Sequence, residues 1–81
     1  MKILLVEDDR NISHFLLKGL REERHLVDLL EDGLAAEEHA YAHEYDIIVL
    51  DIMLPGLNGM DVCRLLRSNG VDTPILMLTA R

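Results

Sequence analysis

The segment DIIVLDIMLPG at residues 46–56 contains an apolar run that ends at Asp51 and leads quickly into a Pro-Gly pair. A short apolar run bounded by aspartates and a turn is typical of a strand buried on both faces of a sheet. A carboxylate at the end of such a strand, with no basic residue near it in the sequence, is costly unless it has a task. Asp51 is therefore the leading candidate for a functional residue.

A second stretch has the same form, because the apolar residues 3–6 run directly into Glu7, Asp8 and Asp9. We predict strands at residues 2–6, 25–30, 46–50 and 75–78, and helices at residues 11–23, 34–43 and 58–69. The spacing of apolar residues on the first helix predicts one buried face, formed by Ile12, Phe15, Leu16, Gly19 and Leu20. Apolar strands that alternate with such helices favour an α/β fold, in which helices cover both faces of a parallel sheet.

Length and composition restrict the kinds of function. With 81 residues, of which 49% are hydrophobic, the chain forms at most one domain. Its net charge of -7 argues against nucleic acid or an anionic membrane as a direct partner, and it suits a cation. No run approaches the roughly 20 apolar residues of a membrane helix, and none resembles a signal peptide, so we expect a soluble, cytoplasmic protein. The single cysteine, Cys63, is expected to pack in the core.

The candidate site residues all follow strand ends, where open parallel sheets bind their ligands. If the first and third strands are neighbours, Asp8 and Asp51 lie close enough for repulsion to raise a carboxyl pKa, unless a cation lies between them. Carboxylate oxygens suit Mg²⁺, and a carboxylate beside such a metal can attack a phosphoryl group. After the fourth strand, the hydroxyl of Thr79 is placed to bond a phosphoryl oxygen, and Ala80 leaves room for the donor.

Residues 6–9, 50–59 and 77–81 together resemble the receiver domain of bacterial two-component response regulators, most closely the OmpR/PhoB-type subgroup. Each of the three motifs lies at the end of a predicted strand, and the resemblance covers the whole chain. It implies a flavodoxin-like, doubly wound parallel sheet with the full strand order 2-1-3-4-5. The chain supplies the first four of these strands and the three helices between them.

The resemblance also implies a role for each candidate residue. Asp51 is the phosphoacceptor, which receives a phosphoryl group from a sensor histidine kinase. Glu7 and Asp8 are the acidic pair. Asp8, Asp51 and the backbone carbonyl of Met53 hold Mg²⁺, while Glu7 acts on the metal through water. The switch residues are Thr79 and Ala80. The family gives Asp9 no function, and we expect a solvated loop acid at this position.

The family's domain continues past the fourth strand with a helix, a fifth strand and a last helix, roughly 40 further residues at average element lengths. Since this chain stops at Arg81, we expect residues 1–81 to form a partial receiver domain without that portion and without an effector domain. The family's lysine and its usual dimerisation face lie in the same portion. An exposed fourth strand and first-helix face predict a homo-oligomer or swapped assembly, or else poor folding.

Three functions from different classes are compatible with these residues. The first is a phosphorelay receiver that normally controls a transcription-factor output domain, through which the parent protein would contact DNA. The second is a structural or oligomerising fragment that cannot switch because it lacks the lysine. The third is a phosphohydrolase of the haloacid dehalogenase type, which requires an aspartate two residues after the nucleophile. That position is Met53, so we do not expect an enzyme.

Overall fold

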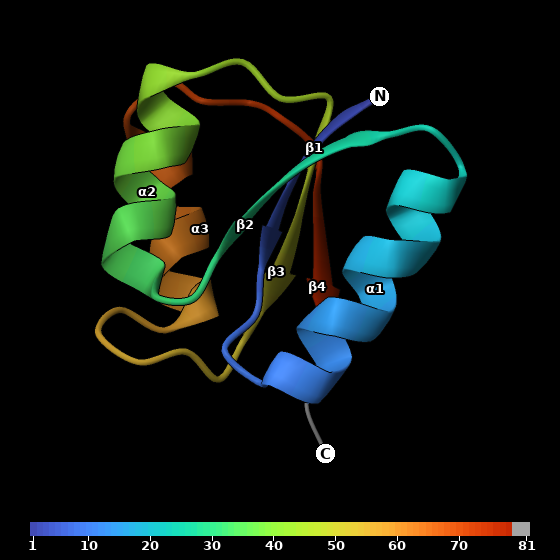
Figure 1. Cartoon of the computed structure of the whole chain (residues 1–81). Coiled ribbons are helices and arrows are strands. Elements are labelled where there is room, and N and C mark those ends of the chain that lie inside the picture. The colour runs from blue at the N-terminus through green and yellow to red at the C-terminus, as the bar shows by residue number, and fades with distance from the viewer. Residues whose placement is uncertain (79–81) are drawn as a thin grey trace.

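The computed structural model describes residues 1–78, which form seven alternating strands and helices (Figure 1). In chain order these are β1 (Lys2–Val6), α1 (Arg10–Glu22), β2 (Leu26–Leu30), α2 (Gly33–Ala42), β3 (Ile47–Asp51), α3 (Gly59–Ser68) and β4 (Ile75–Leu78). All paired strands are parallel, and the sheet order is β2-β1-β3-β4. The predicted α/β fold is confirmed, and the strand order agrees with the first four positions of the doubly wound arrangement.

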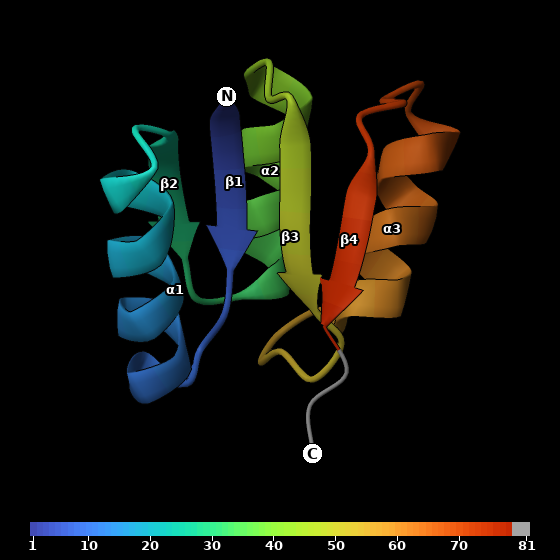
Figure 2. The same cartoon turned by 90° about the vertical axis from the view of Figure 1, so that its right-hand side faces the viewer.

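The sheet divides the apolar core into two clusters because successive residues of a strand point to opposite faces. Helices α2 and α3 cover one face, and α1 lies on the other, as Figure 2 shows. The cluster under α2 and α3 consists of Leu4, Val6, Ala36, Ala40, Tyr45, Ile48, Leu50, Val62 and Leu66. The cluster on the α1 face consists of Ile3, Leu5, Val27 and Val49. The cluster on the α1 face has fewer buried residues, so this face of the sheet is less completely covered.

Helix α1 buries only part of its predicted apolar face. Leu16 and Leu20 pack against the cluster on the α1 face, whereas the side chain of Phe15 is 78% exposed. The helix lies against β1 and β2, and among residues 1–78 no helix covers β3 and β4 on this side (Figure 2). Leu76 on β4 is accordingly 53% exposed. The periodicity of α1 was a sound indication of a helix, but the surface that would bury Phe15 is not present in the described part of the chain.

Each helix begins at a side chain that accepts hydrogen bonds from its first turn. Asn58 caps α3, and Asp32 caps α2. Asp9 caps α1, because its carboxylate accepts hydrogen bonds from the backbone N–H groups of Asn11 and Ile12 at 2.9 and 3.2 Å. The expectation that Asp9 is a solvated loop acid was therefore wrong. An N-cap aspartate typically contributes about 1 kcal/mol to stability.

The structure also bears on the packing of Cys63 and on the presence of membrane-spanning helices. Cys63 on α3 is only partly buried, whereas Val62 and Leu66 on the same helix are fully buried, so Cys63 does not join the buried core as expected. None of the helices within residues 1–78 combines the length and the apolar character that a membrane span needs.

Candidate functional site

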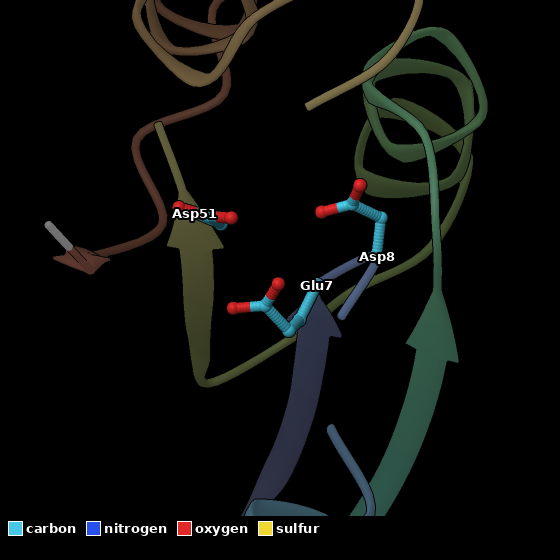
Figure 3. A group of neighbouring side chains, drawn as sticks. All are labelled: Glu7, Asp8 and Asp51. Carbon is cyan, nitrogen blue, oxygen red and sulfur yellow. The ribbon is translucent and has the colours of Figure 1, made fainter. Parts of the chain in front are cut away.

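The acidic residues that follow β1 meet the acidic residue that ends β3. The two strands are adjacent in the sheet, and Val6 pairs with Leu50, so the next residues along the two strands are Glu7 and Asp51. One carboxylate oxygen from each of Glu7, Asp8 and Asp51 lies within 4.8 Å of the others. Figure 3 shows the three side chains pointing toward a common space at this edge of the sheet. The predicted meeting of strand ends is thus observed for these residues.

Asp51 is the most deeply buried of the three carboxylates, with 0% of its surface exposed. Its Oδ1 atom accepts a hydrogen bond from the backbone N–H of Met53 at 3.2 Å. Its Oδ2 atom is buried and has no hydrogen-bond partner within residues 1–78. Burying a charged oxygen without a partner is costly, and either a cation or a proton held by the neighbouring Glu7 carboxyl group would reduce that cost.

Glu7 is also buried, with 2% of its surface exposed, whereas Asp8 is exposed. Burial raises the pKa of the Glu7 carboxyl group, and the neighbouring charges of Asp51 and Asp8 raise it further. The backbone N–H of Asp9 donates to Glu7 Oε2 at 3.0 Å and partly opposes this rise in pKa. The sequence predicted that repulsion between Asp8 and Asp51 raises a carboxyl pKa, and in the structure the carboxyl group with the raised pKa is that of Glu7.

The backbone that follows Asp51 is held by the start of α3. The N–H of Gly59 donates to the carbonyl of Ile52 at 2.9 Å. A Cβ atom at Gly59 would lie 2.3 Å from the carbonyl oxygen of Asp51, which is too close for any other residue without a shift. Gly56 has a φ angle of +77°, which favours glycine. The Pro55-Gly56 and Asn58-Gly59 pairs therefore form the turn and the helix start, and they fix the end of β3.

Of the remaining predicted site residues, the structure describes Met53 but not Thr79 and Ala80. The side chain of Met53 is 62% exposed, which leaves its backbone as the part that faces the site through the bond to Asp51. Thr79 and Ala80 lie outside the described residues. The capping role of Asp9 was not predicted, although an aspartate just before a predicted helix is a known start signal. A backbone contact of Gly33 with the loop after Asp51 was not predicted either.

The donor set of this cluster fits a hard divalent cation. Glu7, Asp8 and Asp51 offer only carboxylate oxygens, which are the protein ligands that Mg²⁺ and Ca²⁺ prefer. A cation there would also be a positively charged partner for the Oδ2 atom of Asp51, which has no hydrogen-bond partner among the described residues. The cluster is able to hold a metal ion at the carboxyl edge of the sheet.

Comparison with known proteins agrees with this geometry. The family model of the response regulator receiver domain matches residues 3–81. The chain belongs to the response regulator receiver domain family. A probable transcriptional regulatory protein, SilR of Salmonella typhimurium, is 50% identical over 80 residues, which is 99% of this chain and 35% of the relative. The transcriptional regulatory protein CusR of Escherichia coli K12 is 49% identical over 80 residues, with the same coverage. This receiver domain chain thus spans about a third of the length of these curated relatives.

Solved receiver domains share the fold. The receiver domain of the Francisella response regulator 1452 has a TM-score of 0.93 at 32% identity, over 98% of this chain and 65% of that chain. The response regulator TrrA of Thermotoga maritima, solved in complex with Mg²⁺-BeF, has a TM-score of 0.90 at 36% identity, over 99% and 70% of the two chains. The receiver domain of the Pseudomonas aeruginosa sensor histidine kinase PA1611 has a magnesium ion in its active site cleft; its TM-score is 0.87 at 37% identity, over 99% and 67%.

Proposed function

We propose that this receiver domain accepts a phosphoryl group on Asp51 from a sensor histidine kinase, in a reaction that depends on Mg²⁺. The main support for the proposal is the environment of the Oδ2 atom of Asp51. This atom is buried without a hydrogen-bond partner in the described part of the chain, at the carboxyl end of a central strand and beside two other carboxylates. A purely structural aspartate would have its buried oxygens paired, as nearly all buried polar atoms do.

The proposed metal ligands are Asp8, Asp51 and the backbone carbonyl of Met53, with Glu7 acting through water. The three-carboxylate cluster and the magnesium ions of the PA1611 and TrrA structures support this assignment. When bound, Mg²⁺ would offset the negative charge that builds up on the transferring phosphoryl group. The chain's own contribution is to hold Asp51 rigidly, through the Met53 N–H and through α3, so that the carboxylate needs little reorientation.

In the proposed transfer, an oxygen of Asp51 attacks the phosphorus atom in line with the phosphorus–nitrogen bond of a phosphohistidine. A new oxygen–phosphorus bond forms, the phosphorus–nitrogen bond breaks, and its electron pair stays on the imidazole nitrogen, which takes up a proton. Asp51 becomes an acyl phosphate. The Thr79 hydroxyl then bonds a phosphoryl oxygen, and Ala80 leaves space for the donor.

The proposed output is control of transcription through another part of the parent protein. SilR and CusR are transcriptional regulators, and this chain covers 35% of each. The net charge of -7 disfavours direct contact of this segment with DNA. We also propose that the chain forms a homo-oligomer or swapped assembly, since exposed apolar side chains on α1 and β4 are available for contact between copies.

The phosphoacceptor assignment can be tested by incubating the chain with acetyl phosphate and Mg²⁺ and measuring intact mass. We expect a gain of about 80 Da, the mass of one phosphoryl group, in the unmodified chain. The gain should disappear in Asp51→Asn, which keeps the size of the side chain but removes the attacking carboxylate. It should also disappear when EDTA removes the metal.

Asp9→Asn is the matched control, because asparagine retains the N-cap of α1 and the variant changes an aspartate in the same acidic turn. This control should gain mass as the unmodified chain does. Labelling that persists in Asp51→Asn, or an unmodified chain that gains no mass, would contradict the proposal.

A further inference from the structure

The turn between β2 and α2 touches the loop that follows Asp51. The backbone N–H of Gly33 donates to the carbonyl of Pro55 at 3.2 Å. A Cβ atom at Gly33 would lie 1.6 Å from the carbonyl oxygen of Leu57 and 2.6 Å from its carbonyl carbon. These atoms belong to backbone, so they cannot turn aside as a flexible side chain can. Residues 55–57 can occupy this position only because residue 33 has no side chain.

The same loop is attached to the site at both of its ends. At its start, the N–H of Met53 donates to Asp51 Oδ1 at 3.2 Å. At its end, Asn58 caps α3, and Gly59 donates to the carbonyl of Ile52 at 2.9 Å. The middle of the loop rests on Gly33 and packs against the core beneath α2 and α3 through partly buried leucines. A displacement of the middle must therefore be taken up at one of the two ends.

We infer that Gly33 is a positioning residue for the phosphoryl-transfer site. Because Gly33 has no side chain, residues 55–57 can pack against the start of α2. This contact keeps the backbone of Met53 in the position where its N–H bonds Asp51 Oδ1. The inference rests on the proposed function, because its effect is on the backbone carbonyl of Met53, a proposed Mg²⁺ ligand. Residues that orient metal ligands without touching the metal commonly matter for affinity.

The backbone of Gly33 makes the substitution Gly33→Ala informative. Gly33 begins α2 and is not among the residues with positive φ, so alanine meets no conformational penalty there. Alanine is also the better helix former. Any loss of function in Gly33→Ala would therefore come from the contact with Leu57 and not from the local backbone.

The test compares Gly33→Ala with Gly19→Ala, both in the full chain. Gly19 lies on α1, where an added Cβ atom would meet nothing within 4 Å. We expect Gly33→Ala to raise the Mg²⁺ dissociation constant, measured by calorimetric titration, about tenfold. Its rate of labelling by acetyl phosphate should fall at a Mg²⁺ concentration that saturates the unmodified chain. Gly19→Ala should match the unmodified chain in both measurements.

Three outcomes separate this inference from the proposed function. A Gly33→Ala variant that melts at lower temperature but binds Mg²⁺ as the unmodified chain does, well below its melting point, would overturn the positioning role. An unmodified chain that neither binds Mg²⁺ nor gains mass would overturn the proposed function itself. If Gly33→Ala fails to fold, the amide resonance of Gly33 in the unmodified chain decides. Mg²⁺ should shift this resonance while leaving that of Gly19 in place, and an unchanged Gly33 resonance would contradict the inference.

Discussion

At the scale of single residues, the buried carboxyl groups of Asp51 and Glu7 lower the free energy of unfolding when both are ionised. Both carboxyl groups are almost completely buried, and they lie close to each other and to Asp8. Such an arrangement lowers stability unless a cation or a proton is present. The structure therefore predicts that stability depends on pH through Glu7, whose pKa is raised by burial, and on Mg²⁺ through the cluster of three carboxylates.

Glu7 gives this dependence a definite sign. Its pKa in the folded chain is raised above the ordinary value of 4.5, chiefly by burial. Between the two pKa values the unfolded chain has lost the proton and the folded chain still holds it, so the free energy of unfolding falls as pH rises. In EDTA, we expect stability to decrease from about pH 4.5 upward until Glu7 is ionised in the folded state as well.

Denaturant unfolding at a series of pH values, on the unmodified chain and on Glu7→Gln, measures this effect. Glutamine cannot ionise, so its variant should lose less stability over the same pH range. Parallel curves for the two proteins would show that Glu7 does not account for the decline. Addition of Mg²⁺ should reduce the decline in the unmodified chain, because a cation favours the ionised carboxylates.

The sequence predicted the meeting of Glu7, Asp8 and Asp51 because parallel strands place their carboxyl ends at one edge of a sheet. The site residues Thr79 and Ala80 remain predictions, since they lie outside the described residues. The role of Gly33 could not be predicted in the same way. Its contact with Leu57 depends on how the β2–α2 turn and the loop after β3 pack together, and no local pattern in either segment carries that information.

At the scale of elements, the cap of α1 links helix stability to the site. The side chain of Asp9 caps the helix, while its backbone N–H donates to Glu7 Oε2. We expect Asp9→Ala to lower the free energy of unfolding by about 1 kcal/mol, because two N–H groups in the first turn lose their acceptor. Asp9→Asn should cost much less. Urea unfolding measures both, and an unaffected Asp9→Ala would show that the cap contributes little.

The helices and strands themselves could be predicted closely because their signals are local. The apolar strand residues and the helix expected at residues 58–69 were visible in the sequence, and the structure confirms them with bounds that differ by one residue for α3. The predicted inner face of α1 was less accurate. Periodicity identifies an apolar stripe, but it does not say how much of that stripe finds a partner, and Phe15 finds little among the described residues.

At the scale of the whole molecule, the open side of the sheet predicts association between copies. Phe15 is 78% exposed on α1, and among the described residues no helix covers β3 and β4 on the same side of the sheet. We expect light scattering to give a mass above the 9.2 kDa of one chain, and Phe15→Ser to move that mass toward the monomer. Because the phenyl ring is mostly exposed, its loss should change folding stability little.

Tyr41→Ser is the matched control for this measurement. Tyr41 is 64% exposed on α2, on the opposite side of the sheet, so its replacement should leave the mass unchanged. A sharp mass of 9.2 kDa for the unmodified chain, together with a cooperative melt, would contradict association through this side.

The central place of β1 also bears on how the chain is made. β1 precedes both of its partner strands in the chain, and it pairs with β2 on one side and with β3 on the other. The pairing of β1 with β3 includes Ile3 and Ile47, so it cannot form until Ile47 has been synthesised. At five to twenty residues per second, the nascent chain keeps this edge open for roughly two to nine seconds. During that interval the apolar residues 3–6, which are buried in the folded chain, lack their β3 partner and are exposed to chaperones and to other nascent chains.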